Sequence, residues 1–152
     1  MKIEIKSRQK IEDRASMPFI PSAALISITD HGDSFAELKC KPDWLLQLAF
    51  DDVPVAEDFG AEIGHAPFEK ERKQIEARYH GMTDLQARQI VDFYREVRGK
   101  AGTLICQCEQ RQSRSATLAA AFLEYGIEVF ANDAYFPNRS IYRKILAMLR
   151  EE

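Results

Sequence analysis

The amino-acid sequence predicts one α/β domain of three layers, in which helices flank a central, mostly parallel sheet. Three observations lead to this fold class. Apolar runs of strand length alternate along the chain with helical stretches, as expected for a parallel sheet covered on both faces. The length of 152 residues fits a single domain spanning 1–152. The apolar fraction of 45% is that of an ordinary globular protein with a buried core.

Strands are expected at five places. Polar and apolar residues alternate over 2–5, which predicts a short first strand. Apolar runs at 23–28, 44–50 and 103–107 predict buried strands, with the 44–50 run at the centre of the sheet. A short extended segment is expected at 127–130.

The first helices are recognised by their caps and apolar faces. Ser7 is a candidate N-cap for a short helix over 8–15, and the charged stretch 67–79 predicts a surface helix. Thr83 is the candidate N-cap of a strongly amphipathic helix that Gly99 ends.

Two more helices complete the domain. An alanine-rich helix is expected over 114–125, with Gly126 as its stop. The residues "PNRS" at 137–140 open a last helix, capped by Asn138 or Ser140.

Composition limits the cellular setting and the partners. The net charge of −3 is spread along the chain and argues against a nucleic-acid or membrane-surface partner. The first ten residues lack a signal-peptide core, and no apolar run is long enough to cross a bilayer. The 3 cysteines fit a reducing cytoplasm, and the 3 histidines lack metal-ligand spacing. We expect a cytoplasmic protein with free thiols and no metal or cofactor.

The stretch "CQCEQRQSRSA" holds the strongest functional pattern. Cys108 ends the predicted strand, and Arg114 follows after five residues at the start of a helix. A free thiol has a pKa of ~8.5, and a helix N-terminus with nearby cations favours the thiolate. Loop amides can surround an anion, and one guanidinium can grip two of its oxygens. Ser115 can then hydrogen-bond the thiolate. The plain alternative is a structural cysteine at a strand end, with solvated arginines.

This stretch resembles the signature of the cysteine-dependent protein tyrosine phosphatases, His-Cys-x-x-Gly-x-x-Arg-Ser/Thr, and especially their dual-specificity branch. The whole chain is similar to a group of small bacterial predicted tyrosine phosphatases. Shared features are the "SITD" strand, a strand ending in Phe-x-Asp, the "LICQC" strand and the late "YFPNRSIYRKIL" segment.

The resemblance implies a phosphatase-like fold and a cysteine-dependent hydrolysis of phosphomonoesters, phosphotyrosine above all, through a phosphocysteine intermediate. It implies Cys108 as nucleophile, Arg114 as phosphate ligand and Ser115 as the hydroxyl that assists thiolate departure. The phosphate cradle would be formed by the amides of Glu109, Gln110, Arg111, Gln112, Ser113 and Arg114. The partner would be a phosphorylated protein or a small phosphomonoester.

Two positions depart from the family pattern. Gln107 stands where the family has histidine, and it can still donate a hydrogen bond. Arg111 stands where the family has glycine, although glycine allows positive φ and a close backbone approach. Either Arg111 points outward and attracts an acidic phosphopeptide, or it distorts the cradle. A distorted cradle would leave a weak enzyme or a phosphate-binding pseudophosphatase.

Expulsion of the leaving group needs a general acid. In the family this acid follows a strand, about two residues after its last large apolar side chain. Phe50 makes Asp52 the first choice and Asp51 the second. If the charged segment 58–80 is not an insertion, the acid would be one of three later carboxylic acids, Glu57, Asp58 or Glu76. Otherwise Asp52 belongs to a solvated loop.

Several neighbours of the loop carry further expectations. Cys106 is expected to be a small core residue rather than a disulfide partner. Glu109 should point away from the pocket, with Arg111 and Arg114 offsetting its charge. The loop of His31 and the segment at 135–140 are candidates to line the site. A sulfurtransferase or an arsenate reductase would use a similar cysteine loop, although Ser115 disfavours the sulfurtransferase.

Overall fold

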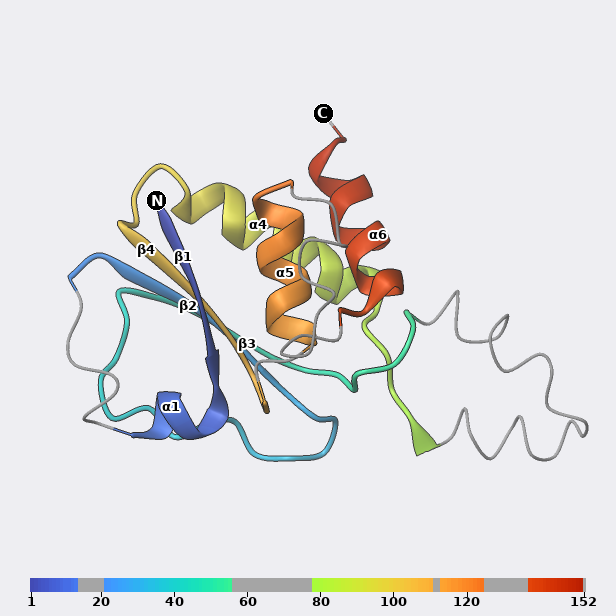
Figure 1. Cartoon of the computed structure of the whole chain (residues 1–152), viewed down its shortest axis with the longest axis horizontal. Helices are drawn as coiled ribbons and strands as arrows, with labels where there is room; N and C mark the ends of the chain where they lie inside the picture. The colour runs from blue at the N-terminus through green and yellow to red at the C-terminus, as the bar shows by residue number, and fades with distance from the viewer. Residues whose placement is uncertain (14–20, 56–77, 111–112, 125–136, 152) are drawn as a thin grey trace, which may run out of the picture.

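A parallel sheet forms the middle layer of the protein (Figure 1). This computed structural model describes residues 1–13, 21–55, 78–110, 113–124 and 137–151. The described sheet has four strands in the order β1-β4-β2-β3, and every neighbouring pair is parallel. The strands are β1 (Lys2–Ser7), β2 (Ala23–Thr29), β3 (Trp44–Ala49) and β4 (Thr103–Cys108).

The strand register brings the carboxyl ends of all four strands to one edge of the sheet. Ser7 of β1 is paired with Cys108 of β4, and Ser27 of β2 with Gln107. Thr29 at the end of β2 is paired with Ala49. In parallel α/β sheets this edge is where ligands bind.

Helices lie on one face of the sheet, where Figure 1 shows α4 (Asp84–Val97), α5 (Arg114–Phe122) and α6 (Arg139–Leu149) together. The strand residues that face them, such as Ile26, Leu104 and Cys106, belong to the larger hydrophobic core.

The opposite face of the sheet has a smaller core. Leu25 and Ile105 point to that side, since successive side chains of a strand alternate between faces. They pack with Ile11 of α1 (Arg8–Glu12) and with Ala36. The predicted three-layer α/β arrangement is therefore confirmed.

The predicted caps of α1 and α4 are present. The Ser7 side chain accepts a hydrogen bond from the backbone N–H of Lys10, and α1 ends at Glu12 rather than at residue 15. Thr83 and Gln86 form a reciprocal capping box at the start of α4. Local sequence therefore sets both helix starts.

The last two helices begin differently. Asn138, rather than Ser140, caps α6 by accepting a hydrogen bond from the backbone N–H of Ile141. At α5 the N-cap position is Ser113, whose side chain makes no capping hydrogen bond. The first turn of α5 thus lacks the usual side-chain acceptor for its free N–H groups.

One strand lies away from its predicted place. Strand β3 was expected at the centre, but it ends the order of the described strands. Its burial is correspondingly uneven, whereas every residue of β2 is buried. The run at 44–50 is apolar because its side chains still pack on the core through Leu46, Leu48 and Phe50.

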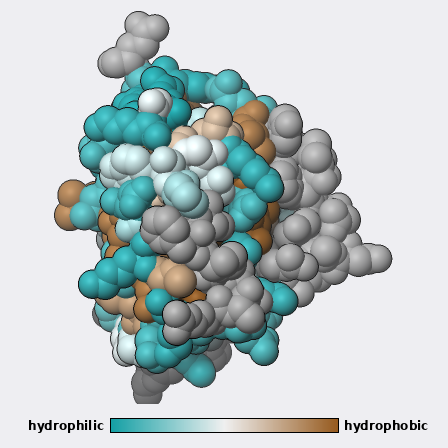
Figure 2. All heavy atoms as spheres, turned by 90° about the vertical axis from the view of Figure 1, so that its left-hand side faces the viewer, coloured by the Kyte–Doolittle hydropathy of each residue, from teal (hydrophilic) through white to brown (hydrophobic). Residues whose placement is uncertain are grey.

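The described surface carries large apolar side chains at scattered places, including Phe35, Leu45 and Leu85. The face in Figure 2 is largely hydrophilic, with hydrophobic residues in small groups. Among the helices of the described ranges, none has the length and apolar character of a membrane span. Most of the predicted helix at 67–79, the segment at 127–130 and Gly126 lie outside the described residues.

Candidate active site

A cavity of about 410 Å³ opens at the carboxyl edge of the sheet, between the end of β4 and the start of α5. It is lined by residues from four segments: Asp30, Asp51, Asp52, Val53, Tyr79, Cys108, Glu109, Gln110, Ser113 and Arg114. Six of these were selected from sequence as first-choice site residues, and Asp51 was the second choice for the general acid. Arg111 and Gln112, also selected, lie outside the described residues, so the effect of the missing glycine stays a prediction.

The candidate nucleophile lies at the base of this cavity. Cys108 is 3% exposed, and its Sγ is 3.1 Å from the Oγ of Ser115 in the first turn of α5. Ser115 is itself fully buried, so bulk water does not compete for its hydroxyl group. A thiolate at Cys108 would therefore have a hydrogen-bond donor in place.

Cys106 belongs to the same hydrophobic core as Cys108. Complete burial, followed by the nearby Cys108, raises the pKa of the Cys106 thiol far above its ordinary value. Cys106 stays a neutral thiol, and all three cysteines are free. This agrees with the prediction of a small core residue.

Arg114 is the first residue of α5, and its side chain is only 6% exposed. Its Nη1 donates to the backbone oxygen of Phe50 at 2.7 Å and lies 2.8 Å from Oδ1 of Asp30. Its Nε is buried and has no hydrogen-bond partner among the described residues. Such an orphaned charged donor is costly unless a ligand accepts from it.

Asp52 accepts hydrogen bonds from the starts of two helices, α5 and α6. Its Oδ1 accepts a hydrogen bond from the Ser113 hydroxyl at 2.8 Å and from Nδ2 of Asn138 at 3.0 Å. Asn138 also donates from Nδ2 to the backbone oxygen of Val53 at 3.0 Å. The sequence identified Asn138 only as a helix cap. Its second role arises because α6 begins beside Asp52; of the 135–140 segment expected near the site, residues 135 and 136 lie outside the described residues.

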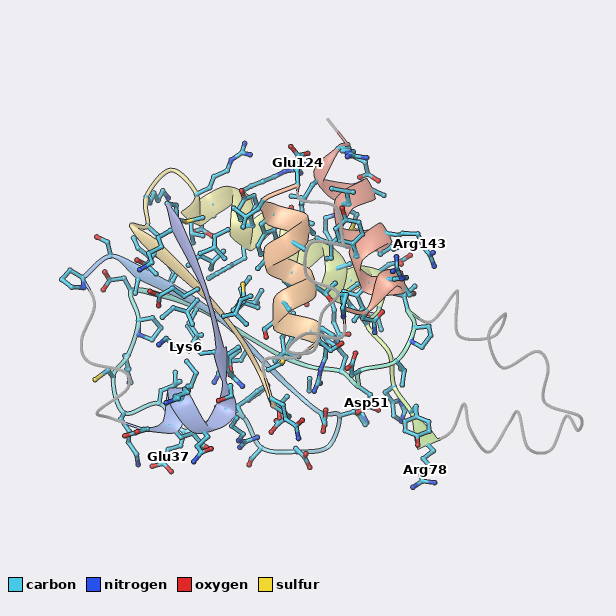
Figure 3. The ribbon with its side chains drawn as sticks, viewed as in Figure 1. Lys6, Glu37, Asp51, Arg78, Glu124 and Arg143 are labelled. Carbon is cyan, nitrogen blue, oxygen red and sulfur yellow. The ribbon has the colours of Figure 1, made fainter. Side chains whose placement is uncertain are left out.

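Asp51 has a different set of partners. Its Oδ1 accepts from the backbone N–H of His31 at 3.0 Å, and its Oδ2 accepts from that of His80 at 2.7 Å. The two histidine rings stack with centroids 3.8 Å apart. In Figure 3, Asp51 lies between the sheet edge and the segment that carries Arg78. Asp51 thus ties two chain segments together through both carboxylate oxygens.

Glu109 follows the candidate nucleophile and is paired with an unexpected partner. Its Oε1 accepts from Nη1 of Arg8 at 3.1 Å and from the hydroxyl of Thr29 at 2.9 Å. The expectation that Arg114 offsets Glu109 was wrong, because Arg114 pairs with Asp30 instead. Burial lowers the pKa of Arg8, but the hydrogen bonds and charges of Glu109 and Glu12 raise it overall. Sequence gave no signal for this pairing.

Gln107 precedes Cys108, and its hydrogen bonds to the described residues do not reach the Cys108 sulfur. It is fully buried, accepts from the Ser27 hydroxyl and donates from Nε2 to the backbone oxygen of Cys108 at 3.0 Å. The expectation that Gln107 donates a hydrogen bond is thus met, but the acceptor is backbone. Gln107 fixes the strand end on which Cys108 lies.

The structure brings Cys108, Arg114, Ser115 and Asp52 to one cavity edge, while Glu57, Asp58 and Glu76 lie outside the described residues. Within the described ranges no cluster of three His, Cys, Asp or Glu side chains could hold a metal ion. Comparison of the chain with protein-family models and with curated proteins found no match. The functional argument therefore rests on the geometry of these residues.

Proposed function

We propose that the protein is a cysteine-dependent phosphatase of the protein tyrosine phosphatase type, acting on a phosphomonoester such as phosphotyrosine. One observation carries the proposal. Cys108, Arg114 and Ser113 at the uncapped start of α5 line one cavity, and the buried Nε of Arg114 has no hydrogen-bond partner among the described residues. A buried guanidinium beside free helix amides is an anion site, and the adjacent sulfur gives that site a nucleophile.

Binding follows from the same groups. The loop amides and the N-terminal turn of α5 would surround the phosphoryl oxygens, and Arg114 would donate from Nε. Asp30 and the Phe50 carbonyl hold Nη1 from the other side, which fixes the guanidinium plane. A fixed plane lowers the entropy that substrate binding would otherwise have to overcome.

The first chemical step is attack of the Cys108 thiolate on phosphorus. An S–P bond forms while the P–O bond to the leaving group breaks, and the leaving oxygen takes a proton from Asp52. Within the part of the chain that the structure describes, the hydrogen bonds of Asp52 reach Oδ1. Its Oδ2 is then the atom that carries the proton. Asp51 suits this role less, since both of its oxygens accept backbone hydrogen bonds.

The second step is hydrolysis of phosphocysteine. Water attacks phosphorus, the S–P bond breaks, and Asp52 accepts the proton of the water. The Ser115 hydroxyl, 3.1 Å from the sulfur, stabilises the departing thiolate. A reducing cytoplasm suits this cycle, because Cys108 must stay a free thiol.

The test is hydrolysis of an aryl phosphate and chemical trapping of the intermediate. Native protein should release phosphate, be inhibited by vanadate and yield a radiolabelled phosphocysteine on quenching. Cys108→Ser should lose the activity by at least about a thousandfold. Cys40→Ser, a change at a free cysteine outside the cavity, is the matched control and should keep it.

Failure of the enzyme is also informative. A native protein that binds phosphate but forms no phosphocysteine would be the pseudophosphatase expected if Arg111 distorts the loop. In that case Arg111→Gly should restore turnover. A native protein with no hydrolysis and no phosphate binding would refute the proposal altogether.

A further inference from the structure

A second cavity, of about 490 Å³, lies on the other side of the start of the loop. It is lined by Arg8, Gln9, Glu12, Asp13, Glu109 and Gln110. Only Glu109 and Gln110 are shared with the first cavity. The peptide bond between Glu109 and Gln110 therefore lies between the two cavities, one lined by Arg8 and the other by Cys108.

Arg8 is anchored from several directions at this place. Its Nη1 donates to Thr29 Oγ1 and to Glu109 Oε1, each at 3.1 Å. Its Nε lies 3.3 Å from Glu12 Oε1, and its Nη2 is 3.2 Å from the backbone oxygen of Phe35. The three guanidinium nitrogens thus connect α1, the end of β2, the loop after β2 and the candidate catalytic loop.

The backbone of Arg8 adds a separate contact. Its N–H donates to the carbonyl oxygen of Glu109 at 3.1 Å, continuing the pairing of β1 with β4. In a trans peptide the C=O and the next N–H point in opposite directions, and the described residues contain no cis peptide bond. Because the Glu109 carbonyl points to Arg8, the N–H of Gln110 points to the opposite side. That side is the first cavity.

Charge gives the Arg8 side chain a second effect. A carboxylate next to a reacting thiolate and a phosphate dianion would repel both. The Glu109 carboxylate is instead held by Arg8 and Thr29, with side chains of Arg8 and Glu109 only 21% and 28% exposed. Arg8 therefore keeps this charge paired.

We propose that Arg8 is the positioning residue of the phosphate-binding loop, and that it turns the Gln110 N–H toward the bound phosphate while neutralising Glu109. This inference rests on the proposed phosphate site, but it does not require turnover. The backbone and the side chain of Arg8 contribute separately, so two substitutions at this position can distinguish their effects.

The experiment compares Arg8→Ala with Arg8→Pro. Alanine removes the guanidinium and keeps the N–H, whereas proline removes both. Proline suits this site, because Arg8 is the first residue of α1 and Ser7 before it is extended, with φ −80° and ψ 166°. Arg88→Ala is the matched control, since Arg88 pairs with Glu151 away from the cavity.

Two readouts are used with inorganic phosphate as the probe. Calorimetry gives the affinity, and the amide resonance of Gln110 in a ¹H–¹⁵N spectrum reports the hydrogen bond to the anion. Arg8→Ala should weaken phosphate binding about fivefold, and Arg8→Pro about fivefold more. The phosphate-induced shift of the Gln110 amide should be reduced in Arg8→Ala and lost in Arg8→Pro.

The outcomes are distinct. Equal affinities and equal Gln110 shifts in both variants and the native protein would overturn the role of Arg8, whatever their melting temperatures. If Arg8→Pro does not fold, an unchanged Gln110 shift in Arg8→Ala is enough to overturn the proposed role of Arg8. A native protein that binds no phosphate overturns both proposals. One that binds phosphate without hydrolysing it refutes only the enzyme.

Discussion

The two ends of the candidate catalytic loop are held in opposite ways. At the Glu109 end, the side chain and the carbonyl are both paired with Arg8, and Thr29 adds a further contact. At the Arg114 end, a buried Nε has no partner among the described residues, and the helix start lacks a side-chain cap. At the Glu109 end, the side chain and the carbonyl have hydrogen-bond partners within the protein. The other end has a buried donor without a partner among the described residues, which a bound anion could satisfy.

A similar contrast separates the neighbouring residues Asp51 and Asp52. Asp51 accepts two backbone hydrogen bonds and joins the loop after β2 to the segment before α4. Asp52 accepts from two side chains, those of Ser113, which lines the cavity, and of Asn138 at the start of α6. Adjacent carboxylates thus have different partners, and we propose a structural role for Asp51 and a chemical role for Asp52.

The largest effect is expected from breaking the ligand-binding end. Arg114→Lys keeps a positive charge but loses the planar donor set and Nε. We expect kcat/KM for an aryl phosphate to fall about a thousandfold, as when a preorganised transition-state donor is removed. Arg88→Lys, at a surface guanidinium, should leave it unchanged. Near-native activity of Arg114→Lys would show that Arg114 does not bind the phosphoryl group.

The second effect sharpens the comparison of the two aspartates. Asp52→Asn should lower kcat about a hundredfold or more for an alkyl phosphate, and far less for a substrate with an acidic phenol as leaving group. Asp51→Asn should retain that leaving-group dependence and instead lower the melting temperature, because the backbone N–H groups of His31 and His80 lose a charged acceptor. If Asp51→Asn rather than Asp52→Asn abolishes the leaving-group dependence, the assignment is reversed.

The smallest effect concerns Asn138, which serves both helix α6 and Asp52. Asn138→Ala removes the cap and should cost about 1 kcal/mol of unfolding free energy. Asn138→Ser keeps a capping oxygen but removes Nδ2, the donor to Asp52 and Val53. We expect Asn138→Ser to unfold like the native protein in urea while kcat falls several-fold. Equal kcat in the two proteins would limit Asn138 to capping.

Much of the fold follows from local patterns. Ser7, Thr83 and Asn138 cap the helices as predicted, because a cap needs only an acceptor side chain and the next turn of backbone. The four described strands begin or end within two residues of the apolar runs that predicted them, since period and β-branching are local properties. Among the described strands β3 lies at the end of the order and not at the predicted centre, because strand order depends on packing across the whole sheet.

Local sequence was enough to predict the candidate catalytic loop: a cysteine at a strand end, an arginine at a helix start and the serine after it, all within eight consecutive residues from Cys108 to Ser115. Tertiary structure decided the partners. Arg8 meets Glu109 across 101 positions, and Asn138 meets Asp52 across 86. Spacing along a strand–loop–helix unit is fixed by covalent geometry. Pairing between distant segments is fixed only when parallel strands bring their carboxyl ends to one edge of the sheet. At that edge, residues of the same type, such as Asp51 and Asp52, acquire different partners.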